Sequence, residues 1–140
     1  MKKILFSILI IIIVVSCSNN TDSRLKEVDP SYIDKNNPAI ITFDDTTIHF
    51  GDVALHELQK HTFTFTNTGK TPLILVDVKS TCGCTVPSWP KDPIAPNEQG
   101  EINVTFNPSH PGKVKKTIRI SANTYPRTLT KIHIEANVVD

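Results

Sequence analysis

The chain has 140 residues, of which 39% are hydrophobic and 21% charged, so it can form one domain with one ordinary core and is not expected to be disordered. Its 15 Lys and Arg against 14 Asp and Glu give a net charge of +1, which becomes −1 if Lys2 and Lys3 are removed with a leader. A general nucleic-acid-binding protein is therefore not expected.

The N-terminus has the layout of a signal peptide. Lys2 and Lys3 precede residues 4–15, a run of 12 residues that is apolar except for Ser7. A helix that spans the hydrocarbon core of a bilayer takes about 20 residues, so a removable leader over residues 1–16 is favoured over a permanent transmembrane helix. The run ends V-V-S-C, which resembles the lipobox of bacterial lipoproteins. The alternative is ordinary secretion, with Cys17 as an incidental thiol.

The lipobox resemblance implies that Cys17 becomes the new N-terminus and carries acyl chains such as palmitate. Several acyl chains would anchor the protein to a membrane permanently. Because Ser18 and Asn19 follow the cysteine, rather than aspartate, the resemblance points to the outer membrane, with the protein facing the periplasm. Residues 17–38 contain few apolar side chains and are predicted to form a tether, whose flexible part spans about 25 Å.

Residues 39–140 are predicted to form the folded domain, because apolar and polar residues alternate there with the period of half-buried strands. The alternation covers residues 62–66, 102–106, 117–121 and 132–138, and earlier strands are expected at 39–43 and 46–50. Residues 72–79 are apolar on both sides, which predicts the most central strand. All five glycines are expected between strands. About seven strands predict an all-β, immunoglobulin-like antiparallel β-sandwich, with a small closed barrel as the alternative.

Five segments of this domain resemble a known family. They read I-H-F-G-D-V, H-T-F-T-F-T-N-T-G-K-T-P-L, V-K-S-T-C-G-C-T-V-P-S-W-P, P-I-A-P-N-E-Q-G-E-I-N-V-T-F-N-P and G-K-V-K-K-T-I-R-I-S-A-N. From about Phe43 to Asn123 the chain resembles the bacterial domain-of-unknown-function family 1573. The resemblance implies an immunoglobulin-like fold similar to the major-sperm-protein and cilium-associated domains, which serve largely in docking, and it implies no activity. Asn97 stands where that family usually has glycine and is expected to adopt the same left-handed turn.

The turn T-C-G-C-T at residues 81–85 holds two thiols that invite three interpretations. Cys82 and Cys84 could form a disulfide that glycine makes sterically feasible and that could serve as a redox group. They could instead bind copper or zinc as a soft-metal site, completed by a histidine from the set His49, His56, His61 and His110. The third interpretation is a structural turn with buried, inert thiols.

Other candidate binding residues are Trp89 and a group of cations. Trp89 is expected to cap the core beside the cysteine turn, with stacking on a sugar as the alternative. Lys113, Lys115 and Arg119 should share one face of a strand, where they form either an ordinary solvated face or a surface that attracts acidic polysaccharide or lipid headgroups.

The sequence contains no serine-hydrolase, zinc-protease or phosphate-loop motif, so no catalytic residues are predicted and the protein is not expected to be an enzyme. We expect a cell-envelope lipoprotein that acts as a binding or scaffolding module. Its partners would be the membrane, through the lipid anchor, and an envelope protein or polysaccharide, with no resident cofactor. The alternative is a thiol-based metal-binding or redox protein that uses Cys82 and Cys84.

Overall fold

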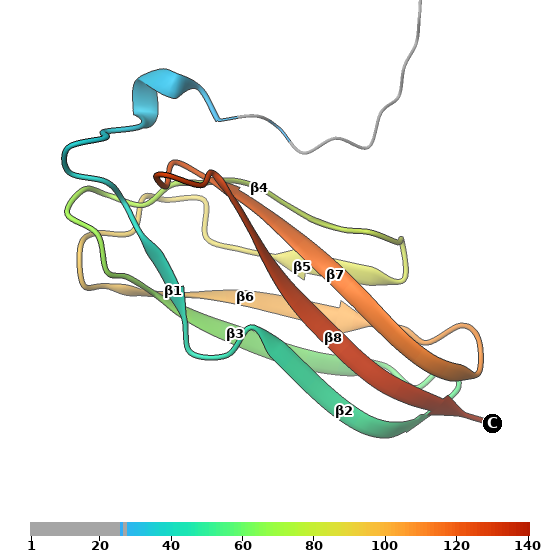
Figure 1. Cartoon of the computed structure of the whole chain (residues 1–140). Coiled ribbons are helices and arrows are strands. Elements are labelled where there is room, and N and C mark those ends of the chain that lie inside the picture. The colour runs from blue at the N-terminus through green and yellow to red at the C-terminus, as the bar shows by residue number, and fades with distance from the viewer. Residues whose placement is uncertain (1–25, 27) are drawn as a thin grey trace, which may run out of the picture.

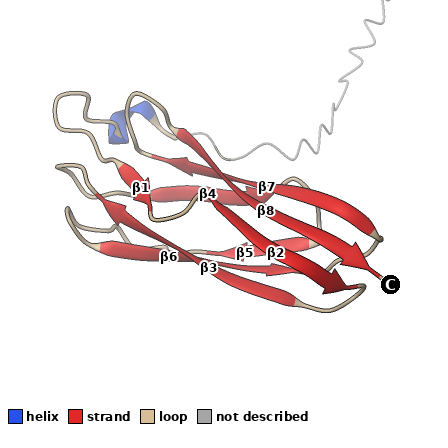
Figure 2. Ribbon diagram, turned by 60° about the horizontal axis from the view of Figure 1, so that its bottom comes forward, coloured by secondary structure: helices blue, strands red, loops and turns tan. Residues whose placement is uncertain are grey.

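The computed structural model describes Lys26 and residues 28–140; the predicted signal peptide, Cys17 and the first part of the predicted tether lie outside the described residues. Two four-stranded sheets pack face to face (Figures 1 and 2). The first sheet has the order β1 (Ile41–Phe43), β3 (Gln59–Asn67), β6 (Gln99–Phe106) and β5 (Thr85–Ser88). The second has the order β2 (Thr47–Ala54), β8 (Leu129–Val139), β7 (Gly112–Ala122) and β4 (Leu75–Ser80).

The predicted all-β immunoglobulin-like sandwich is confirmed, with eight strands where about seven were expected. The pairs are antiparallel except that β2 pairs with β8 in parallel. The described residues include one 3-10 turn, η1 (Pro30–Tyr32), which lies at the end of the sandwich opposite the C-terminus (Figure 1). The described residues contain no helix that is long and apolar enough to cross a membrane.

The core lies between the two sheets and is built from the apolar positions of the predicted alternation. The first sheet contributes mainly phenylalanines and the second mainly isoleucines, and all of them are at most 1% exposed: Phe63, Phe65 and Phe106 on one side, and Ile118, Ile120, Ile132 and Ile134 on the other. Burial of each such side chain contributes about 1.5–3 kcal/mol. Among the described residues, all buried apolar side chains lie between Ala39 and Val138 and form one cluster, so we expect residues 26–140 to fold as a unit.

The prediction that residues 72–79 form the central strand is wrong, because β4 is an edge strand that pairs only with β7. The register of that pair shifts between Leu75 and Asp77. Leu75 and Val78, three positions apart, are therefore both buried. An irregularity of this kind brings an odd-numbered and an even-numbered residue to the same face of the strand, and this explains why the segment is apolar on both sides.

The expectation that every glycine lies between strands is also wrong. Gly51 lies within β2, at its irregularity, with a φ of +71° that side chains disfavour. Gly100 lies within β6, where a Cβ would overlap the ring of Phe65. By contrast, Asn97 has a φ of +66°, as predicted for its left-handed turn. The strand β5 was not predicted, because it is short and contains Pro87, which is tolerated on an edge strand.

The described part of the predicted tether is bonded to the domain. Its hydrogen bonds run from Lys26 N–H to Asp77 Oδ2 (2.9 Å), from Asn123 Nδ2 to the Tyr32 carbonyl (3.3 Å), from Thr71 Oγ1 to the Asn37 carbonyl (3.0 Å) and from Lys70 N–H to the Pro38 carbonyl (3.0 Å). Gly69 allows this close approach, because a Cβ there would overlap the Pro38 carbonyl. Lys26, Tyr32, Asn37 and Pro38 are therefore attached to the folded domain by hydrogen bonds.

Asn67 is a fully buried polar residue that fastens the loops at this end of the sandwich. Its Nδ2 donates to the carbonyls of Thr71 and Ile94, both at 2.9 Å, and its Oδ1 accepts the N–H of Gly69 at 3.0 Å. Truncation of Asn67 would leave these buried backbone groups without partners, at about 1–3 kcal/mol for each group.

We expect Asn67→Ala to lower the free energy of unfolding of residues 26–140 by about 2–4 kcal/mol, measured by urea denaturation. The matched control is Asn103→Ala, which removes an exposed amide bonded to Thr62 (2.6 Å). That change should cost less than about 1 kcal/mol, because water replaces the lost bond. Equal losses in the two variants would contradict the role of Asn67.

Candidate functional site

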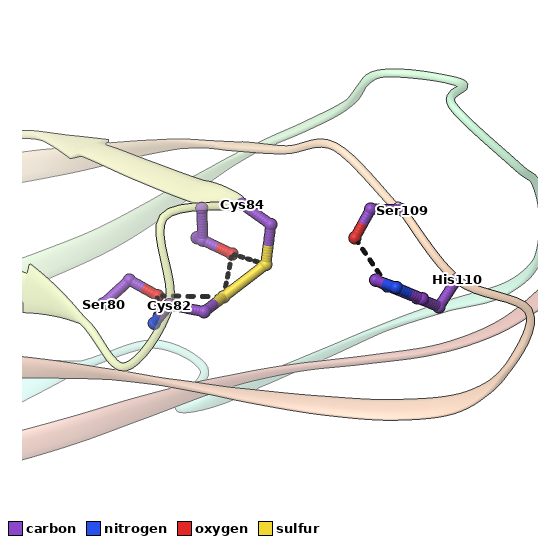
Figure 3. Close-up of a disulfide and its surroundings, with 6 residues drawn as sticks. Ser80, Cys82, Cys84, Ser109 and His110 are labelled. Carbon is purple, nitrogen blue, oxygen red and sulfur yellow. Dashed lines mark hydrogen bonds between the residues drawn. A yellow bond between two sulfur atoms is a disulfide. The ribbon is translucent and has the colours of Figure 1, made fainter.

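The cysteine turn connects the two sheets, since it leaves β4 of the second sheet and enters β5 of the first. Cys82 and Cys84 are joined by a disulfide within this turn, with their Cα atoms 5.4 Å apart (Figure 3). Before the disulfide, Thr81 N–H donates to the carbonyl of Thr117 on β7 (3.0 Å). At its far end the Cys84 carbonyl accepts the N–H of Asn107, just after β6 (2.8 Å). The disulfide thus closes a turn that is fixed to both sheets.

Hydroxyl groups lie near the disulfide, and two basic side chains line a cavity together with Cys84. The Oγ atom of Ser80 lies 4.0 Å from the sulfur of Cys82, and Oγ1 of Thr85 lies 4.0 Å from both sulfurs. Because disulfide sulfurs carry no proton, only the hydroxyls can donate in these contacts. Cys84 also lines a cavity of about 40 Å³ together with His110 and Lys116. His110 is hydrogen-bonded to Ser109 in the neighbouring loop (Nδ1 to Oγ, 2.9 Å; Figure 3).

The histidines proposed as additional metal ligands are dispersed over the domain. His49 lies 3.1 Å from Glu135 on the outer face of the second sheet. His61 packs edge-on against Phe63, with ring centroids 4.6 Å apart, and partial burial lowers its pKa. His56 occupies a turn with a φ of +64°. In the part of the chain that the structure describes, no three His, Cys, Asp or Glu side chains converge as a metal site.

Trp89 packs against the core near the cysteine turn, as the sequence favours. The ammonium group of Lys91 lies 3.0 Å from the centre of the Trp89 ring. This cation–π contact covers one face of the indole. Its Nε1 is buried and has no hydrogen-bond partner among the described residues. Lys91 thus occupies the ring face that it contacts, and stacking of Trp89 on a sugar stays a prediction.

The three cations predicted to act together lie on the outward side of β7, but the neighbouring strands give them different surroundings. Lys115 is opposite Glu135 on β8 and forms an ion pair with it (2.7 Å). The hydrogen bond from Lys115 lowers the pKa of Glu135. Lys113 is opposite Asn137 and lines the same groove of about 470 Å³ as Lys115 and Glu135. Within this pair of cations, the charge of Lys115 is therefore balanced by Glu135.

Arg119 has different neighbours. It lies directly opposite Lys79 on β4 and directly opposite Lys131 on β8, so three cations form a row across three adjacent strands. We name these three residues the cation row. Lys79 pairs with Asp77 (3.2 Å), whereas Arg119 and Lys131 make no ion pair within the described residues. Sequence reasoning missed Lys79 and Lys131, because the register between two strands cannot be read from either strand alone. The alternation within each strand indicated only that these two lysines point outward.

Residues 41–138 match the family model described as "Protein of unknown function (DUF1573)". The chain belongs to this family. The sequence matches no curated protein. The sandwich and its cysteine turn are thus the DUF1573 domain, and the predicted resemblance to domain-of-unknown-function family 1573 is confirmed.

Solved structures share the fold of this DUF1573 domain. A protein of unknown function from Porphyromonas gingivalis W83 is 18% identical with a TM-score of 0.63; the match covers 71% of this chain and 46% of that one. The PapD-like domain 7 of human CEP192 is 12% identical with a TM-score of 0.62, covering 82% of this chain and 94% of that one. The VesB protease of Vibrio cholerae is 15% identical with a TM-score of 0.59, and the match covers 73% of this chain and 32% of that one. At these identities the similarity concerns the fold alone.

We expect residues 26–140, secreted into an oxidising compartment, to have an intact mass about two units below the reduced value and to resist thiol alkylation until reduced, because Cys82 and Cys84 are bonded. The double variant Cys82→Ser/Cys84→Ser should lose about 1–2 kcal/mol of unfolding free energy, as loop-closure entropy predicts for so short a loop. Immediate alkylation of the native protein, or retention of copper or zinc, would contradict the disulfide state.

Proposed function

We propose that this protein is an exported lipoprotein of the cell envelope, anchored in the outer membrane through Cys17 and facing the periplasm. The carrying observation is the leader itself, in which two lysines and a 12-residue apolar run end at V-V-S-C. A run of this length is too short for a membrane-spanning helix, which needs about 20 residues. The folded domain begins soon after Cys17, since residues from Lys26 onward are already bonded to it.

We further propose that the domain is a non-enzymatic binding or scaffolding module for an envelope protein or polysaccharide. The DUF1573 sandwich supports this proposal by its construction: its interior is filled by apolar side chains, and most of its charged side chains are exposed on the surface. One solved structure with this fold is a PapD-like domain, and in a protease the matched part is about a third of the chain. A fold that recurs as a part of larger proteins suits a docking role.

A thiol-based function is the second candidate, and the observation that favours it is the disulfide beside His110 and Lys116. An external dithiol could reduce the disulfide by two electrons, and the nearby cation would stabilise the thiolate that is released. Binding of copper or zinc would require that same reduction first, because paired thiolates are the ligands.

Lipidation is tested by labelling cells that express the full chain with an alkyne-bearing fatty acid. The wild-type protein should take up the label and fractionate with membranes, and Cys17→Ser should lose both properties because the acyl chains have no attachment point. The variant Cys82→Ser/Cys84→Ser is the matched control and should stay labelled. Unlabelled wild-type protein would refute the lipoprotein proposal.

The scaffolding role is tested by chemical cross-linking in intact cells, followed by purification of the full chain. A discrete adduct with one envelope component should form with the wild-type protein and equally with Cys82→Ser/Cys84→Ser, because docking does not require the thiols. A thiol–disulfide turnover of the purified protein that disappears in the same variant would instead establish the redox function.

A further inference from the structure

We propose that the cation row of Lys79, Arg119 and Lys131 is a membrane-facing surface that binds anionic phospholipid headgroups. This inference rests on the proposed lipid anchor at Cys17, to which it adds an orientation of the domain. Its carrying observation is that three positive side chains stand directly opposite one another on β4, β7 and β8, next to the point where the N-terminal segment joins the domain.

The row is not explained by folding stability. Side chains directly opposite each other on antiparallel strands have Cβ atoms about 4.5–5.5 Å apart, and like charges at that spacing destabilise the sheet. Within the row, Lys131 also acts on the neighbouring His133, whose pKa is lowered mainly by partial burial; the charges of Lys115 and Lys131 lower it and that of Glu135 raises it. An anionic ligand across the row would relieve this repulsion.

The row also does not serve to protect a sheet edge. A lysine on an edge strand can prevent pairing with other chains, and Lys79 on β4 could do so. Arg119 and Lys131, however, lie on β7 and β8, which are the two interior strands of the sheet. Both side chains are exposed on its outward face, so they are available to a ligand.

The chain connection places this face near the lipid. The N–H of Lys26 donates to Asp77 Oδ2 (2.9 Å), and the same oxygen lies 3.2 Å from the ammonium group of Lys79. The N-terminal segment therefore meets the domain at one end of the cation row. Cys17 is nine residues before Lys26, and a fully extended chain of that length reaches about 30 Å. An acyl-anchored domain must keep this corner close to the bilayer.

The positive charge of the cation row favours an anionic ligand. The negative surface of a bilayer that contains anionic lipid attracts basic residues that lie within a Debye length, which is about 8–10 Å at physiological salt. Three cations in register across adjacent strands of one outward sheet face can meet several phosphate groups at once. Lys79 and Lys115 are each paired with an acidic side chain, so Arg119 and Lys131, which make no ion pair within the described residues, supply most of the attraction.

The test uses residues 26–140, which lack Cys17, with phosphatidylcholine vesicles that do or do not contain phosphatidylglycerol. The wild-type domain should co-sediment with the anionic vesicles only, and added salt should release it. Arg119→Gln/Lys131→Gln should weaken partitioning by about tenfold or more, whereas the charge-matched control Lys60→Gln/Lys113→Gln should weaken it far less. The first variant should also raise the urea midpoint at low salt, because repulsion is relieved, which shows that it is folded.

Equal loss in both variants, or no binding of the wild-type domain to anionic vesicles, would overturn the proposal. Retention on an acidic polysaccharide that depends on Arg119 and Lys131, without vesicle binding, would also overturn it. None of these three results tests the lipidation of Cys17, which is measured separately by fatty-acid labelling of the full chain.

Discussion

The packing of a phenylalanine-rich sheet face against an isoleucine-rich one is the interaction on which the rest of this domain depends. Phe63 and Phe65 of β3 and Ile132 and Ile134 of β8 are excluded from solvent, while the residues between them point outward. A slip of one residue in either strand would exchange these side chains for threonine, histidine and glutamate, so the core also fixes the register. Every outward feature, including the cation row, takes its position from that register.

Local alternation was enough to predict the sandwich and four of its strands, because the period of two is a property of each strand alone. Sheet order is a property of the whole fold, and for that reason β4 was placed at the centre although it lies at an edge. Asn67 was missed for a related reason: asparagine usually marks a turn. The spacing from Asn67 to Gly69 was a usable signal, since the Asn67 side chain accepts the Gly69 N–H.

At the candidate site, the sequence likewise identified the residues of interest, whereas their bonding partners became known only from the assembled sheets. Two cysteines separated by a glycine indicate local chemistry, yet the sequence left a disulfide, a metal site and inert thiols open. The structure joins Cys82 to Cys84 in the turn that passes from one sheet to the other. In the same way, Lys113, Lys115 and Arg119 look equivalent along β7. Their cross-strand neighbours distinguish them, since Glu135 faces Lys115 whereas Lys79 and Lys131 face Arg119.

The bonding of residues 26–38 to the domain changes how an anchor at Cys17 would act. A flexible tether of some 20 residues would let the domain rotate freely above a membrane. With Lys26 bonded to Asp77 and Pro38 bonded to Lys70, the linking chain shortens to the residues between Cys17 and Lys26. The effective concentration of a tethered group at its binding surface falls as the linker grows longer. A shorter link therefore raises the effective concentration of the domain's nearby surface groups at the bilayer. Under the proposed membrane contact, individually weak interactions of Arg119 and Lys131 with the bilayer would be enough to orient the domain.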